Sequence, residues 1–198
     1  MFDYDGTIVD SLHVFCDACV TVFARNGYPQ YATCERALAF LDGNWFEALA
    51  AAGLSPQVID ELEDEFSAQA SEGVPRPFEG MPELIERLAR RNAVVVITSS
   101  RGDDVKRIIA EHRLQGISEV LGADTATSKL VKIRMARERH GSELKPWYVG
   151  DTVGDIVEAK AAGVSSIGVG WGWQGAEKLR AAEPDLMAYS PGDLLVLE

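Results

Sequence analysis

The stretch AVVVIT, residues 93–98, decides the fold class. Residues 94–97 form an unbroken β-branched apolar run. A strand that is apolar on both faces is typical of a parallel sheet covered by helices on each side. The residues before it (82–91, PELIERLARR) and after it (103–114, DDVKRIIAEHRL) have the apolar spacing of helices. The stretch therefore predicts a helix–strand–helix unit of an α/β domain.

The alternation of strand and helix continues toward the C-terminus. SEVLGA (118–123) predicts a weak strand, WYVG (147–150) and SSIGVG (165–170) predict further strands, and helices are predicted for 127–141 and 153–163. Such an order implies right-handed crossovers and a parallel sheet between two helical layers. We therefore predict a Rossmann-like, three-layer α/β core, whose ligands bind at the carboxyl ends of the strands.

The segment between the N-terminal stretch and this core has a different pattern. Residues 12–76 are acidic and helical in their periodicity, with helices expected around 12–27, 34–41, 44–53 and 55–71. A stretch rich in Pro and Gly (72–82) then leads back to the core. We predict a core domain made of residues 1–11 and 79–198, with a small all-helical cap domain, 12–78, inserted into it.

Composition and charge exclude several classes of function. The chain has 198 residues and a net charge of −12, which argues against a nucleic-acid partner because phosphate contacts need clustered Lys and Arg. Neither a membrane-spanning apolar run nor a secretory signal is apparent, so a cytoplasmic protein without a membrane partner is expected. Three cysteines, an odd count, favour reduced thiols over a disulfide framework, and CDAC (16–19) favours helical packing over a zinc site.

Polar side chains recur where the predicted strands end. FDYDGT (2–7) carries Asp3 and Asp5, although only two residues precede Asp3, too few for a normal strand. Each polar residue alone has an ordinary structural explanation, such as a turn, a helix N-cap or a solvated lysine. These explanations do not account for the fact that all of the polar residues are expected at one edge of the sheet. The set comprises Asp3, Asp5, Thr98, Ser99, Lys129, Asp151 and Asp155.

Acids, hydroxyls and a lysine suit phosphoryl transfer. Residues two apart on an extended segment project to the same side, so Asp3 could attack phosphorus while Asp5 acts as general acid and then general base. Two carboxylates beside a phosphate dianion need a cation, and the acids offer the oxygen ligands that Mg²⁺ prefers. Thr98, its neighbour Ser99 and Lys129 could bind the phosphate group of the substrate.

Four stretches in order, DYDGT, ITSS, the Lys129 region and VGDTVGD, resemble the motifs of the haloacid dehalogenase superfamily of phosphatases. The resemblance covers nearly the whole chain and is to the branch with a helical cap between motifs one and two, similar to phosphoglycolate phosphatases. It implies Asp3 as nucleophile and Asp5 as acid/base, with Thr98 and Lys129 binding phosphate. It also implies that Asp3, the Asp5 carbonyl and Asp151 hold Mg²⁺, with Asp155 supporting. The third motif lacks its usual proline, so Lys132 remains an alternative to Lys129.

Substrate choice is less well predicted. Asn44 and Trp45 lie where a cap loop could meet substrate, although a turn and a packed Trp explain them equally well. The predicted cap is acidic, with Arg25 and Arg36 among its few cations, which favours a small phosphomonoester with little further negative charge. The sequence leaves the oligomeric state and the natural substrate open.

Two other reactions and one other class of protein bear on this prediction. The segment from Ser11 to Gly80 contains no lysine, which disfavours Schiff-base chemistry in the cap. A sugar phosphomutase of the same superfamily remains an alternative, because it shares all four motifs. A phospho-receiver signalling module is an alternative from another class of protein, although such modules are shorter and lack the second acid of DYD.

Overall fold

A computed structural model describes residues 1–141 and 145–198, and its centre is a parallel sheet. The named strands are β3 (Val94–Ile97), β4 (Ile117–Leu121), β5 (Trp147–Gly150), β6 (Ser165–Val169) and β7 (Leu186–Ala188). Residues 1–3 pair between β3 and β5, so the order across the sheet is β4, β3, residues 1–3, β5, β6, β7. The predicted parallel α/β core is confirmed.

The short N-terminal stretch hydrogen-bonds on both sides. The Phe2 N–H donates to the Val95 carbonyl over 2.8 Å and the Asp3 N–H donates to the Val149 carbonyl over 2.8 Å. Phe2 is 2% exposed and forms parallel bridges to Val96 and Val149. These bonds place Asp3 at the carboxyl edge of the sheet.

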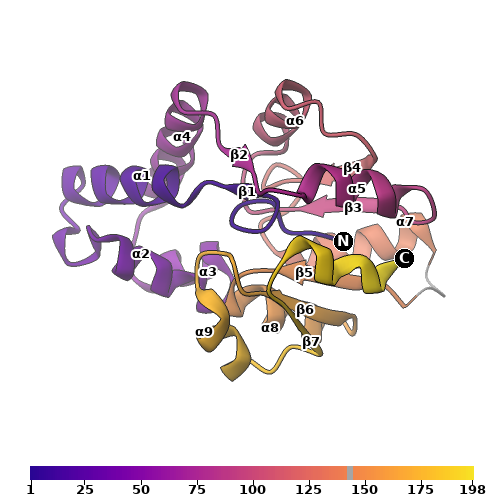
Figure 1. Cartoon of the computed structure of the whole chain (residues 1–198). Coiled ribbons are helices and arrows are strands. Elements are labelled where there is room, and N and C mark those ends of the chain that lie inside the picture. Colours follow the sequence, from indigo (N-terminus) through magenta and orange to yellow (C-terminus); the bar gives the residue numbers. More distant parts are fainter. Residues whose placement is uncertain (142–144) are drawn as a thin grey trace.

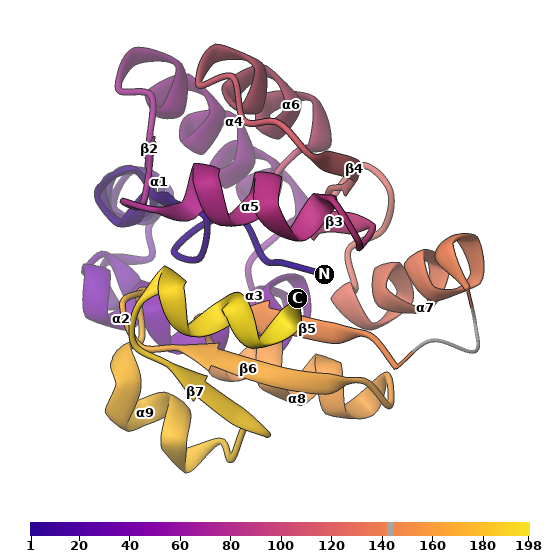
Figure 2. The same cartoon turned by 45° about the vertical axis from the view of Figure 1, so that its right-hand side comes forward.

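Helices cover both faces of the sheet (Figure 2). The helices of the core are α5 (Met81–Ala89), α6 (Gly102–Glu111), α7 (Lys129–His140), α8 (Val153–Ala161) and α9 (Gly175–Ala181). Val94 and Val96 pack with α5 and α6 in one apolar cluster, whereas Val95 and Ile97 pack with α7 and α8 in another. This alternation follows from the two-residue period of a strand and explains why the whole run is apolar.

The remaining helices lie together at one side of the sheet (Figure 1). They are α1 (Leu12–Arg25), α2 (Cys34–Ala39), α3 (Trp45–Ala51) and α4 (Pro56–Glu72), and they share an apolar cluster of their own around Phe23 and Leu49. Two crossings join this group to the core, and they pair as a short antiparallel ladder of β1 (Val9–Asp10) and β2 (Arg76–Pro77). No helix in residues 1–141 and 145–198 is long and apolar enough to cross a membrane.

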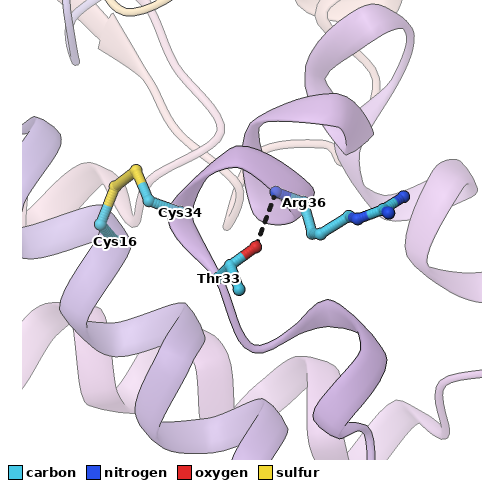
Figure 3. Close-up of a disulfide and its surroundings, with 4 residues drawn as sticks. All are labelled: Cys16, Thr33, Cys34 and Arg36. Atoms are coloured by element: carbon cyan, nitrogen blue, oxygen red, sulfur yellow. Dashed lines mark hydrogen bonds between the residues drawn. A yellow bond between two sulfur atoms is a disulfide. The ribbon is translucent and has the colours of Figure 1, made fainter.

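The cysteines correct one prediction. Cys16 of α1 and Cys34 at the start of α2 form a disulfide, with their Cα atoms 4.7 Å apart (Figure 3). Thr33 next to it caps α2, because its hydroxyl oxygen accepts from the Arg36 N–H over 3.3 Å. The expectation of reduced cysteines is therefore wrong for this pair, and Cys19 is the buried free thiol. The packing of α1 against α2 brings the two residues together, which sequence spacing does not reveal.

We expect the thiol count to report this disulfide. Unfolded in the absence of reductant, the protein should react with a thiol reagent at one residue, Cys19, and after reduction at three. Cys34→Ser should lower the free energy of unfolding by about 3 kcal/mol, because the bridge restricts the unfolded chain between two residues 18 positions apart. Cys19→Ser is the control, since no thiol should then react before reduction. Three reactive thiols in the unreduced protein would contradict the pairing.

Candidate active site

Three neighbouring strands end in polar residues that meet at one edge of the sheet. Asp3 ends the paired N-terminal stretch, Thr98 follows β3 and Asp151 follows β5. All three are almost fully buried, at 4%, 1% and 0% exposure respectively. The parallel order therefore brings together residues that are far apart in the sequence.

Asp3, Asp151 and Asp155 form an acidic cluster. Each offers one carboxylate oxygen, and these three atoms lie within 4.8 Å of one another. Asp155 is held in a capping box at the start of α8, where its Oδ2 accepts from the N–H and hydroxyl of Thr152 over 3.0 and 2.8 Å. Asp151 accepts from the Thr7 hydroxyl over 2.9 Å. These bonds fix the carboxylates before any ligand binds.

A lysine lies against the acids. The Lys129 Nζ is 2.9 Å from Asp3 Oδ1 and 2.6 Å from Asp155 Oδ1. Lys132, one turn further along α7, donates instead to the carbonyls of Thr98 (2.5 Å) and Gly122 (3.3 Å). Lys129 therefore contacts the acidic side chains, whereas Lys132 contacts the backbone of the segment that carries Thr98.

The acidic cluster has the electrostatics of a cation site. Burial and the charge of Asp155 raise the pKa of Asp3, against the opposing effect of Lys129. Burial and Asp155 likewise raise the pKa of Asp151. Burial alone would lower the pKa of Lys129, but Asp155 and Asp3 raise it, so this lysine stays charged. One lysine does not neutralise three buried carboxylates, and a divalent cation with oxygen ligands fits the surplus charge.

Asp5 has a separate set of partners. Its Oδ1 accepts from the Ser11 hydroxyl over 2.7 Å, and its Oδ2 accepts from the Ser100 hydroxyl over 2.6 Å and more weakly from Thr98 over 3.4 Å. Burial raises the pKa of Asp5, and the hydroxyls partly oppose this. A buried carboxyl with a raised pKa is suited to general acid–base catalysis.

Sequence reasoning missed several supporting residues. Ser11 and Ser100 orient Asp5, and Glu158 accepts from the Leu130 N–H over 3.1 Å at the start of α7, where Lys129 lies. The hydroxyl run TSS at the end of β3 was the available signal for Ser100. Nothing in the sequence marks Glu158, because only the packing of α7 against α8 gives it this position.

A cavity of about 90 Å³ lies between the acidic cluster and the helices α1 and α4. Ser99 and Trp45, both predicted to meet substrate, line it. Asn44 does not: its Oδ1 accepts from the Glu47 N–H over 3.1 Å, and its amide nitrogen donates to the Thr127 carbonyl and to Glu158. In this structure Asn44 therefore joins the helical group to the core and does not line the cavity.

Comparisons with known proteins agree with this geometry. The sequence profile of the haloacid dehalogenase-like hydrolase family matches residues 1–169. A phosphoglycolate phosphatase of Vibrio parahaemolyticus is 28% identical in an alignment of 213 positions that covers 98% of this chain and 92% of that protein. Another, from Synechococcus elongatus, is 29% identical and covers 98% and 94%. The chain belongs to the haloacid dehalogenase-like hydrolase family.

Solved structures show the same fold. A haloacid dehalogenase-like hydrolase from Bacteroides fragilis superposes with a TM-score of 0.80 at 21% identity, covering 98% of this chain and 97% of that one. A hydrolase from Pseudomonas syringae also gives a TM-score of 0.80, at 18% identity, covering 98% and 94%. The architecture is therefore retained at low sequence identity.

The two buried lysines should differ on substitution. Lys129→Met should lower kcat/KM for phosphate ester hydrolysis by about 10²–10³-fold, the usual effect of removing a charge at a reacting centre. Lys132→Met should lower it less than about tenfold, but should reduce the free energy of unfolding by about 2 kcal/mol because two buried carbonyls lose their donor. Steady-state kinetics and urea unfolding of both variants test this. A larger loss of activity in Lys132→Met than in Lys129→Met would reverse the assignment.

Proposed function

We propose that this chain is a phosphatase that hydrolyses small phosphomonoesters through an aspartyl-phosphate intermediate and uses Mg²⁺. The observation that carries the proposal is the convergence of three buried carboxylates within 4.8 Å, with Lys129 bonded to two of them. The names of the relatives, phosphoglycolate phosphatases, support a small phosphate ester as substrate.

The first half-reaction uses both acids of DYDGT. A carboxylate oxygen of Asp3 attacks the phosphorus and forms an acyl-phosphate bond, while the bond to the ester oxygen breaks. Asp5, protonated at the start, gives its proton to the departing oxygen so that the alcohol leaves neutral. The hydroxyls of Ser11 and Ser100 hold Asp5 in place for this transfer.

The second half-reaction returns the enzyme to its starting state. Asp5, now ionised, takes a proton from a water molecule, which attacks the phosphorus of the aspartyl-phosphate. Inorganic phosphate leaves and Asp3 is restored as a carboxylate. Asp5 thus acts first as general acid and then as general base, and it is protonated again at the end of the cycle.

Charge neutralisation is shared between the chain and the metal ion. Lys129, Thr98 and Ser99 would bind the phosphoryl oxygens. Asp3, Asp151 and the carbonyl of Asp5 would hold Mg²⁺, with Asp155 in support because its oxygens already accept from Lys129 and Thr152. When bound, Mg²⁺ supplies positive charge that allows a phosphate dianion to approach the carboxylates.

The helical group is proposed to act as a cap domain, 12–78, over a core of residues 1–11 and 79–198. Its α4 contacts the core beside the cavity: Arg101 pairs with Asp64 over 2.6 Å, and the Ser67 hydroxyl donates to Asp104 over 2.6 Å. Its residues Trp45, Leu62 and Phe66 line the cavity opposite Asp3. A lid in this position would exclude water and contact the leaving group.

Asp5→Asn tests the mechanism with two leaving groups. With an alkyl phosphate, which needs protonation, the rate should fall by about 10²–10⁴-fold. With p-nitrophenyl phosphate, whose leaving group needs little protonation, the first step should survive and the phosphoenzyme should accumulate. Intact-protein mass spectrometry after rapid quench measures the added phosphoryl group. Unchanged rates with both esters would remove the acid/base role of Asp5.

A further inference from the structure

Three buried polar atoms without partners belong to residues that line one cavity. In the part of the chain that the structure describes, four buried side-chain polar atoms have no hydrogen-bond partner. Three of them, Tyr4 Oη, Glu63 Oε1 and Trp173 Nε1, belong to residues that line the cavity beside Asp3. Buried polar groups are normally paired, so a cluster of unpaired ones beside a cavity indicates a ligand that supplies the partners.

The rest of the cavity wall is largely apolar. The ring of Phe15 lies 4.6 Å from that of Trp173 and 5.4 Å from that of Trp45, measured between centroids. Leu62 and Phe66 of α4 extend the same wall. Such a surface fits the carbon skeleton of a leaving group and leaves a second anionic group without solvation.

The charges near the cavity also oppose a second anion. Of the described residues that line it, Lys129 and Arg101 are the cations. Lys129 is bonded to Asp3 and Asp155, and Arg101 is bonded to Glu63 (3.4 Å) and Asp64 (2.6 Å). An adjoining hollow shares Glu63, Arg101 and Asp104 and adds three further acids, Asp60, Asp103 and Asp124.

We infer that the leaving group carries a hydroxyl, which donates to Glu63 and accepts from the indole N–H of Trp173. This inference rests on the proposed phosphatase function. A hydroxyl is the smallest group that both donates and accepts, whereas an ammonium cannot accept and a carboxylate cannot donate. Glu63 and Trp173 are then specificity-determining residues, and the substrate class is phosphate esters of hydroxylated alcohols. Burial raises the pKa of Glu63, against the opposing effect of Arg101, which contacts only its Oε2 and leaves Oε1 unpaired.

Four two-carbon esters test this directly: ethyl phosphate, 2-hydroxyethyl phosphate, phosphoethanolamine and phosphoglycolate, each assayed with Mg²⁺. They differ only in what the second carbon carries: nothing further, a hydroxyl, an ammonium, or a carboxylate in its place. We expect kcat/KM for 2-hydroxyethyl phosphate to exceed that for ethyl phosphate by at least about tenfold, with phosphoglycolate below ethyl phosphate. Equal values for ethyl and 2-hydroxyethyl phosphate, or a preference for phosphoglycolate or phosphoethanolamine, would overturn the inference.

Single substitutions test whether Trp173 and Glu63 cause the expected preference for a hydroxylated leaving group. Trp173→Phe should lower the ratio of kcat/KM for 2-hydroxyethyl over ethyl phosphate by about tenfold, mainly through KM, because only the indole N–H is lost. Glu63→Gln removes the charge and should raise phosphoglycolate relative to ethyl phosphate by about tenfold. Glu65→Gln is the matched control, since Glu65 lies on the same helix and pairs with Arg25, and both ratios should stay as in the wild type. Unchanged ratios in Trp173→Phe and Glu63→Gln would exclude these two residues.

The same assays distinguish a failure of the proposed phosphatase function from a failure of the inference about the leaving group. If the wild-type protein hydrolyses neither these esters nor p-nitrophenyl phosphate in the presence of Mg²⁺, the phosphatase assignment itself is wrong. If it hydrolyses them all at similar rates, the assignment stands and the inference about the leaving group falls.

Discussion

Asp3→Asn is expected to abolish phosphate release, with a loss of at least about 10⁴-fold, because the change removes the carboxylate oxygen that we propose attacks phosphorus. The protein should remain folded. Burial and Asp155 raise the pKa of Asp3 in the folded state. An acid whose pKa is higher in the folded than in the unfolded state lowers stability once the pH exceeds both values. Removing its charge should therefore leave the free energy of unfolding unchanged or increase it at pH 7.

Continuous phosphate detection measures the rate of phosphate release, and urea unfolding measures the free energy of unfolding. Asp10→Asn is the matched control, because Asp10 lies in the same N-terminal segment but is exposed. It should retain wild-type activity and stability. Residual activity above about 1% in Asp3→Asn, with a phosphoenzyme still forming, would assign the nucleophile elsewhere.

Removal of divalent metal is expected to have an effect of similar size on turnover. A chelator should abolish hydrolysis, and excess Mg²⁺ should restore it in full. The metal should also stabilise the fold, because it binds a surplus of buried negative charge that exists only in the folded protein. At a concentration 100 times its Kd, Mg²⁺ would add about 2.7 kcal/mol. For a chain of this size that corresponds to a rise in Tm of about 5–10 °C.

Calorimetry with and without Mg²⁺ measures the stabilisation independently of catalysis. Sodium chloride at matched ionic strength is the control, since screening acts mainly on exposed charges. In Asp3→Asn the rise in Tm caused by Mg²⁺ should shrink, because one ligand loses its charge. Full turnover in the presence of a chelator would rule out the metal-dependent mechanism.

The core was predictable where the apolar pattern is continuous. WYVG coincides with β5, and the helix predicted to end at Gly141 is α7. β7 escaped prediction, since it has only three residues and Leu186 is 40% exposed. β1 and β2 escaped it too, because each has two residues and exists only through pairing across 65 intervening residues.

The residues of the candidate site also fall into a part that the sequence predicts and a part that it does not. Residues that follow strands directly, such as Asp3, Thr98 and Asp151, could be placed because the topology fixes where strands end. Lys129 and Lys132 could not be separated by sequence, since both fall at the start of one helix, and only the direction of each side chain distinguishes them. The disulfide depended on tertiary packing in the helical group, which has no counterpart in cysteine spacing.

The pairing of residues 1–3 also bears on how the chain folds. Phe2 joins Val96 on one side and Val149 on the other, partners 94 and 147 residues further along the sequence. Contacts of such long range form slowly, because a large loop must close before they become favourable. Residues 1–3 are therefore expected to be among the last parts of the sheet to pair. Until β5 has formed, Asp3 has no strand on its second side, so catalytic competence and completion of the sheet should arise in the same folding step.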